Sequence, residues 1–133
     1  MNIRRAFTLT KPEKTTEGCA VTSTNPHYLN VMIIYNVTEA IDIDTEQEWV
    51  RWMRTHHIPD VMKTGKFEGY TFSKVLGTPE QDQSASYSLQ YRCQNIEQLE
   101  KYQNENATQL QKEHAAKFLG KFAAFRTVLE VVE

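Results

Sequence analysis

The sequence predicts an α+β domain in which strands and helices follow the order β-α-β-β-α-β. Two observations predict this fold class: strand-like and helix-like segments alternate from Met32 onward, and the two middle strand-like segments are joined by a short polar stretch. The chain of 133 residues is long enough to bury one core of this kind, and a second domain is not expected.

The first half of the domain is expected to be a strand followed by a long helix. Residues 32–38, MIIYNVT, are rich in β-branched and aromatic side chains, which favour a strand. Asp44-Thr45 is expected to cap the following helix, and Glu46 and Glu48 suit the positive end of its dipole. That helix is expected to end just before Gly65, which can adopt the left-handed conformation common after a helix.

The second half is expected to contain three strands and one helix. Residues 66–76 and 85–93 read as two strands, joined by the polar segment GTPEQDQS. Asn95 and Gln98 resemble a capping box that opens the second helix. After it, FAAFRTVLEVVE predicts the last strand. This order is the ferredoxin-like arrangement, in which two helices cover one face of a four-stranded antiparallel sheet.

Residues 1–31 are expected to be a weakly ordered extension or an upstream addition, and residues 32–133 the single domain. Residues 1–30 carry 4 basic and 2 acidic side chains, whereas residues 31–133 carry 11 basic and 15 acidic ones, so the composition changes near Met32. The alternative is a true arm that crosses the domain or a partner subunit, with apolar anchors at Phe7, Leu9, Tyr28 and Leu29.

The composition argues against several classes of protein. Lys and Arg total 15 against 17 Asp and Glu, without the basic patch of a nucleic-acid binder. No apolar run approaches the roughly 20 residues of a membrane-spanning helix, and the N-terminus lacks a secretory apolar region. Cys19 and Cys93 form neither a disulfide framework nor a C-x-x-C pair. A cytoplasmic protein with no nucleic-acid or membrane partner is expected.

The alternation within the strands predicts a homodimer. Tyr87, Leu89 and Tyr91 point to one face of their strand, and polar residues point to the other. The helices cover one face of the sheet, so the second, mixed face is left for a partner sheet or for solvent. We expect a dimer rather than a monomer.

The stretch WVRWMRTHHIPDVMKTGKF, residues 49–67, holds the candidate functional residues of the first helix. At 100° per residue, Trp49, Trp52 and His56 share the stripe expected to face the sheet, whereas His57 falls at its edge. His56 is then either a hydrogen-bonded core histidine or a ligand contact or acid–base group, because histidine titrates near neutral pH. The tryptophans are interpreted first as core anchors.

Pro59 is expected to bend or restart this helix just before it, because proline removes a backbone donor and clashes with the preceding turn. The break is interpreted as a packing solution, or as a gap that admits a small apolar ligand.

No metal site and no cofactor are expected. Adjacent side chains on a helix diverge by about 100°, so His56 and His57 cannot share one ion. His114 of the second helix could join His56, but no Cys, Asp or Glu at ligand spacing supports the pair. Cys93 lacks an activating basic neighbour and is expected to be inert.

Arg126 lies in the middle of the last strand, where a charge must be paired or hydrated. It is expected to pair with Glu130 or Glu68, or else to bind an anionic group inside the dimer together with Gln90 or Arg92.

Four segments carry a resemblance to a known family: Met32 to Thr38, Trp49 to Phe67, Tyr87 to Tyr91 and Ala124 to Thr127. They resemble the dimeric α+β barrel superfamily and, within it, a bacterial family of domains of unknown function. The superfamily includes EthD-like proteins and antibiotic-biosynthesis-type monooxygenases. The resemblance implies a fold and a homodimer more firmly than an activity.

Three functions remain open at this point. The first is a homodimer with a small-ligand-binding or accessory role, whose ligand is small and apolar. The second is a cofactor-independent enzyme, monooxygenase-like or isomerase-like, that uses His56 as base beside a pocket shaped by Trp49, Trp52 and Tyr35. The third is a structural dimer that presents a surface to another protein. The candidate pocket residues are His56, Trp49, Trp52, Tyr35, His114 and Arg126.

Overall fold

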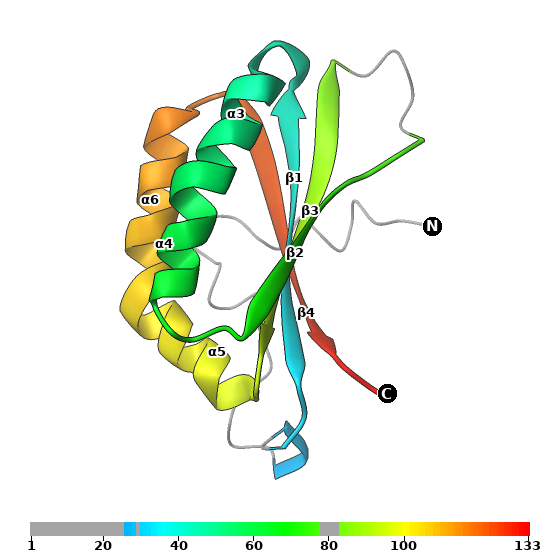
Figure 1. Ribbon diagram of the computed structural model, residues 1–133, viewed down its shortest axis with the longest axis vertical. Coiled ribbons are helices and arrows are strands. Elements are labelled where there is room, and N and C mark those ends of the chain that lie inside the picture. The colour runs from blue at the N-terminus through cyan, green and yellow to red at the C-terminus, as the bar shows by residue number, and fades with distance from the viewer. Residues whose placement is uncertain (1–25, 29, 78–82) are drawn as a thin grey trace.

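The computed structural model describes residues 26–28, 30–77 and 83–133, and it shows one antiparallel sheet with helices on one face (Figure 1). The strands are β1 (Ile33–Asp42), β2 (Gly69–Lys74), β3 (Ser84–Cys93) and β4 (Phe122–Glu130), in the spatial order β2-β3-β1-β4. The predicted ferredoxin-like α+β fold is confirmed.

Each helical region contains a wider π-helical turn between two α-helical segments. The first region comprises α3 (Glu46–Trp52), η4 (Met53–His57) and α4 (Ile58–Lys63). The second comprises α5 (Ile96–Tyr102), η5 (Gln103–Ala107) and α6 (Thr108–Lys117). A π-helical turn holds one residue more than the α-helical repeat, so each region changes its side-chain phase halfway along.

The expected interruption at Pro59 takes the form of the η4 turn. In a regular helix the ring of Pro59 would meet the carbonyl of Thr55. Here the backbone N–H of Ile58 donates to the carbonyl of Met53, five residues back, and the chain continues as α4 from Ile58. The wide turn therefore accommodates the proline within one helical region.

The same turn reverses the prediction for the two histidines. Met53 and Ile58, five residues apart, are both buried, whereas His56 between them is exposed. His57 instead lies on the sheet side. The prediction that His56 faces the sheet is wrong because the repeat of 100° per residue does not hold through a π-helical turn.

The ends of the helical regions partly follow the predictions. The Asn95 side chain accepts a hydrogen bond from the backbone N–H of Gln98 at 3.0 Å, as expected of a cap. Thr45 makes no capping hydrogen bond, so the predicted Asp44-Thr45 cap is wrong; a 3₁₀ turn, η3 (Ile43–Thr45), leads into α3 instead. Gly65 has φ +75°, the left-handed conformation predicted for it.

The core lies between the sheet and the helices. Tyr35 on β1, Trp49 on α3 and Leu99 on α5 are each no more than 2% exposed. In the register of the sheet, Val37 of β1 lies opposite Leu89 of β3 on one side and Arg126 of β4 on the other. Because paired residues share a face, Arg126 is on the helix-covered side of the sheet.

Before β1, a short 3₁₀ turn, η2 (Pro26–Tyr28), packs onto the domain. Tyr28 contacts the core, and His27 Nε2 lies 2.9 Å from Glu130 Oε2. The predictions for Phe7, Leu9 and Leu29 fall outside the described residues. In the described part of the chain, no helix is both long and apolar enough to span a membrane.

Candidate functional site

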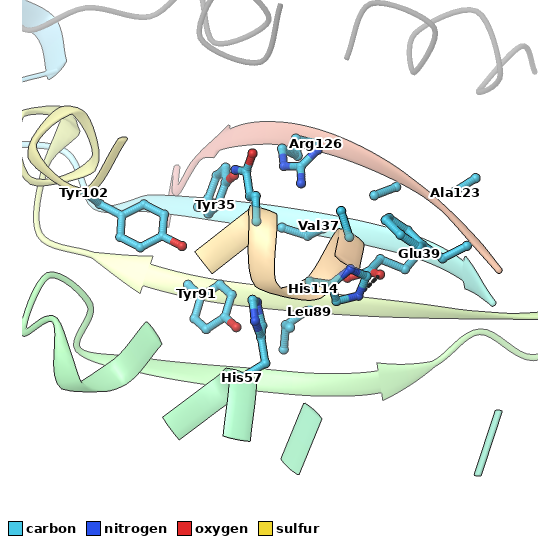
Figure 2. A pocket seen from close by; sticks show the side chains of 14 residues that line it. Tyr35, Val37, Glu39, His57, Leu89, Tyr91, Tyr102, His114, Ala123 and Arg126 are labelled. Carbon is cyan, nitrogen blue, oxygen red and sulfur yellow. Dashed lines mark ion pairs between the residues drawn. The ribbon is translucent and has the colours of Figure 1, made fainter. Parts of the chain in front are cut away.

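A cavity of about 310 Å³ lies between the helices and the part of the sheet formed by β3, β1 and β4 (Figure 2). Its volume is within the range of small-molecule sites, which is about 300–1,000 Å³. Strand β1 supplies Tyr35, Val37 and Glu39, which share one face because side chains alternate along a strand. Leu89 and Tyr91 of β3 extend that surface.

The other walls come from β4 and from both helical regions. Arg126 of β4 brings a guanidinium group, the one Lys or Arg side chain among the described residues that line the cavity. His57 of η4, Tyr102 of α5 and His114 of α6 come from the helical layer. Polar groups from six different elements therefore converge on a largely apolar space (Figure 2).

Four buried polar atoms without a hydrogen-bond partner belong to residues that line this cavity. They are Glu39 Oε1, His57 Nδ1, Tyr91 Oη and Arg126 Nε, and they are the full set of such atoms among the described residues. A buried polar group without a partner costs about 1–3 kcal/mol, and more when it is charged. Their concentration at one cavity is typical of a place where solvent or a ligand supplies the missing partners.

Glu39 and His114 form a buried pair of titratable groups beside the cavity. Glu39 Oε1 lies 2.8 Å from His114 Nε2, and each side chain is 7% exposed. The two atoms are close enough for an ion pair, but their directions do not make a hydrogen bond, so Oε1 remains without one. Glu39 Oε1 therefore keeps its acceptor capacity for another donor.

His114 Nε2 has two polar neighbours, the Trp49 indole and Glu39. The indole N–H of Trp49 donates to this nitrogen at 3.0 Å. An imidazole nitrogen carries either a lone pair or a proton, so it can accept from Trp49 or face Glu39 as an N–H, but not both. In this structure the nitrogen accepts from Trp49, and Glu39 Oε1 receives no hydrogen bond from it.

His57 is held neutral at neutral pH. The pKa of His57 is lowered to about 4, mainly by burial and also by the nearby His114 and Arg126, against the opposing effect of Glu39 and Asp60. Its ring stacks on Trp52 at a centroid distance of 5.5 Å. A neutral His57 presents one donor and one acceptor nitrogen rather than a positive charge.

The tyrosines contribute neutral hydroxyl groups. Burial raises the pKa of Tyr91 and of Tyr102 above the ordinary value; neighbouring tyrosines add to the effect, and Arg126 opposes it at Tyr102. Both therefore act as hydrogen-bonding groups and not as bases at neutral pH. Burial also raises the pKa of the Cys93 thiol to about 12, which agrees with the expectation that this cysteine is inert.

The structure brings together half of the residues singled out from the sequence. Tyr35, His114 and Arg126 line the cavity. Trp49 and Trp52 do not line it, but each contacts a histidine that does. His56 is exposed and lies away from the cavity lining.

The expected ion pair of Arg126 with Glu130 or Glu68 is absent from the described part of the chain. Glu130 pairs with His27 instead, and no carboxylate within the described ranges forms a salt bridge with Arg126. The guanidinium group therefore lines the cavity without forming a salt bridge within the described residues.

Sequence reasoning missed Glu39, His57, Tyr91 and Tyr102 as cavity residues. An acidic residue at Glu39, two positions beyond Val37 on the apolar face of the first strand, was a readable signal, because an acid on such a face must be paired or functional. His57 had no comparable signal, since its direction depends on the π-helical turn.

No three His, Cys, Asp or Glu side chains come together as a metal site within the described residues. The two imidazoles at the cavity, His57 and His114, have ring centroids 5.6 Å apart and lack the third ligand that a site needs. The absence of a metal in the working protein stays a prediction.

The comparisons with known proteins bear on the fold and the family. Residues 32–132 match the family model described as "Domain of unknown function (DUF4286)". No curated protein matches the chain.

Several solved structures share the fold at low identity. An EthD-like protein from Ralstonia eutropha JMP134 has a TM-score of 0.59 and 17% identity, covering 79% of this chain and 96% of its own. A dimeric ferredoxin-like protein from an uncultured marine organism has a TM-score of 0.58 and 12% identity, covering 77% and 97%. The monooxygenase ActVA-Orf6 of Streptomyces coelicolor, solved with nanaomycin D, has a TM-score of 0.52 and 9% identity, covering 85% and 96%.

Proposed function

The chain belongs to the family described as "Domain of unknown function (DUF4286)", and from that premise we propose that it is a homodimer that binds a small, largely apolar molecule between its sheet and its helices. The observation that carries the proposal is the convergence of four partnerless buried polar atoms on one cavity. Such groups fix the orientation of a ligand, and the apolar wall around them supplies the larger part of its binding energy.

The similar structures support this proposal without assigning a ligand. One of them, the Streptomyces monooxygenase, holds nanaomycin D, so a chain of this fold can accommodate a small molecule. Another is described as dimeric, which supports self-association of this chain. A cytoplasmic location is part of the proposal, and the free, buried thiol of Cys93 supports it.

A second candidate function is an enzyme that moves a proton in the same cavity. The Glu39–His114 pair favours it, since a buried carboxylate 2.8 Å from an imidazole can accept a proton from a bound molecule. This pair takes the place of His56, the base considered from the sequence. A monooxygenase-like or isomerase-like reaction is compatible with such a step, and binding in the cavity precedes either one.

Ligand retention and cavity filling test the binding proposal. The protein is purified without added ligand and examined by native mass spectrometry, followed by ligand-observed NMR against a library of small ring compounds. Ala115 lines the cavity, and the adjacent Ala116 is exposed. We expect Ala115→Trp to abolish binding and Ala116→Trp to preserve it, with both variants checked for a cooperative thermal transition.

The proposal fails if the wild-type protein binds no small molecule in either measurement. It also fails if a folded Ala115→Trp variant binds as the wild type does. In either case the structural dimer, the third function considered from the sequence, becomes the leading explanation.

A further inference from the structure

Arg126 and Glu39 are neighbours on the sheet that do not pair. Arg126 lies opposite Val37, and Glu39, two residues further along β1, lies opposite Ala124. This places the two side chains on a diagonal of about 7–8 Å, a separation that a long arginine can span. Within the described residues they form no salt bridge, and both line the cavity (Figure 2). The cation and the carboxylate thus face the cavity separately.

The guanidinium group of Arg126 is best satisfied by an anionic hydrogen-bond acceptor. Its Nε–H is buried without a partner, and a guanidinium donates hydrogen bonds but cannot accept them. Carboxylates fit the planar guanidinium fork and form charge-assisted hydrogen bonds with it. A ligand with one carboxylate would supply the missing acceptor and neutralise the charge.

At the Glu39 end of the cavity, the buried Oε1 atom has no hydrogen-bond partner and needs a donor. A ring hydroxyl group can donate this hydrogen bond. A second anionic group here would meet the Glu39 carboxylate, which argues against dicarboxylates.

The surface between these ends is apolar and partly aromatic. It includes Val37, Leu89, Tyr35 and Phe122. A flat ring fits such a surface, since aromatic side chains pack with ring ligands in stacked or edge-to-face geometry.

We propose that the cavity selects a small aromatic acid with a ring hydroxyl, with its carboxylate on Arg126 and its hydroxyl at the Glu39–His114 pair. This inference rests on the proposed binding function and adds the chemical class of the ligand. The contact with Arg126 requires a carboxylate in the ligand, and the contact with Glu39 requires a hydroxyl group.

Isothermal titration calorimetry with four probes tests the class. The probes are 4-hydroxybenzoate, 3-hydroxybenzoate, benzoate, which lacks the hydroxyl, and 4-hydroxybenzyl alcohol, which lacks the charge. We expect one hydroxybenzoate isomer to bind tightest. Benzoate and the neutral alcohol should each bind roughly 10-fold or more weakly, as loss of a hydrogen bond to a charged group predicts.

Two variants that remove a charge assign the ends of the ligand. Arg126→Gln should weaken 4-hydroxybenzoate by about 10-fold or more and leave 4-hydroxybenzyl alcohol nearly unchanged. Glu39→Gln should reduce the preference for 4-hydroxybenzoate over benzoate. If Glu39→Gln does not fold, the comparison of 4-hydroxybenzoate with benzoate on the wild-type protein remains the test of the hydroxyl contact.

The inference is overturned if the wild-type protein binds benzoate and the neutral alcohol as well as the hydroxybenzoates. It is also overturned if Arg126→Gln keeps the preference for the acid. If none of the four probes binds, but another small molecule does and Ala115→Trp abolishes that binding, the ligand class is wrong and the binding function stands. If Ala115→Trp has no effect on any ligand, the binding function itself fails.

Discussion

At the scale of single residues, the cavity is defined by side chains whose polar atoms the fold leaves without partners. Tyr91 and Tyr87 show the contrast on one strand. Tyr87 Oη donates to Glu46 Oε2 at 2.6 Å, whereas Tyr91 Oη, four residues along the same face of β3, is buried with no partner. Removal of the Tyr87 hydroxyl, which donates a hydrogen bond, and removal of the Tyr91 hydroxyl should therefore have different effects on the free energy of unfolding.

We expect Tyr91→Phe to leave the free energy of unfolding unchanged or to raise it by up to about 1 kcal/mol, because it removes an unsatisfied buried hydroxyl. Tyr87→Phe is the matched control, and it should lower the free energy of unfolding by about 1 kcal/mol through the lost hydrogen bond. Urea denaturation at pH 7 without ligand measures both. A loss for Tyr91→Phe as large as that for Tyr87→Phe would show that its hydroxyl has a structural partner.

His57 should make stability dependent on pH. Its pKa in the folded protein is about 4, below the ordinary 6.5, so between these values the unfolded chain binds a proton that the folded chain does not. The contribution of His57 to the free energy of unfolding is fully present above pH 6.5 and is lost as the pH falls through 4. The full loss corresponds to about 3 kcal/mol.

The variant His57→Gln, which cannot titrate, should lose less stability than the wild type between pH 7 and pH 4.5. His56→Gln, at the exposed neighbouring position, should follow the wild-type curve. Urea denaturation across this pH range compares the three proteins. All three keep the ionisable groups near His57, which are Glu39, Asp60, His114 and Arg126. Parallel curves for wild type and His57→Gln would contradict the assignment.

At the scale of elements, the sequence was sufficient for the order of the strands and insufficient for the phase of the helices. The strand order followed from local patterns such as the alternation along Ser84–Cys93 and the cap at Asn95. The π-helical turns depend on which side chains reach the core, and that is a property of the tertiary packing. Pro59 signalled an interruption but not its form.

The helical phase decided how much of the candidate site could be predicted. Arg126 and Tyr35 were identified because strand periodicity does not change along their strands. His56 was chosen over His57 because a uniform helix was assumed. The buried pairs Met53–Ile58 and Tyr102–Ala107, both five residues apart, follow the wider π-helical repeat, which becomes evident only from the burial of these side chains in the fold.

The two helical regions also differ in how they begin, and this difference can be measured. Asn95 caps α5 with a side-chain hydrogen bond at 3.0 Å, whereas Thr45 makes none at the start of α3. We expect Asn95→Ala to lower the free energy of unfolding by about 1 kcal/mol and Thr45→Ala to change it by less than about 0.5 kcal/mol. Urea denaturation separates the two, and equal losses would contradict the observed caps.

At the scale of the whole molecule, the described residues leave one face of the sheet without helices, and the centre of that face is polar. Asn36 donates to Thr38 Oγ1 at 3.0 Å and to Thr127 Oγ1 at 3.1 Å, and it accepts from Ser88 Oγ at 2.8 Å. Asn36 is only 8% exposed. Satisfied polar groups of this kind can lie within a subunit interface without leaving unpaired donors or acceptors.

We expect two copies to associate through this face, so light scattering at micromolar concentration should give twice the chain mass of 15.5 kDa. Ser88→Lys places a charge at the centre of the face, where burial without a partner costs several kcal/mol, and it should shift the protein to the mass of one chain. Ala116→Lys adds the same side chain on the exposed side of α6 and should leave the dimer intact.

The ligand cavity lies on the opposite side of the sheet from the proposed interface, within one chain. A folded Ser88→Lys monomer should therefore keep the cavity, and loss of binding in that monomer would mean that the partner subunit helps to form the site. A monodisperse wild-type monomer, in contrast, would contradict the proposed interface and leave the cavity argument unchanged, since all of its lining residues come from one copy.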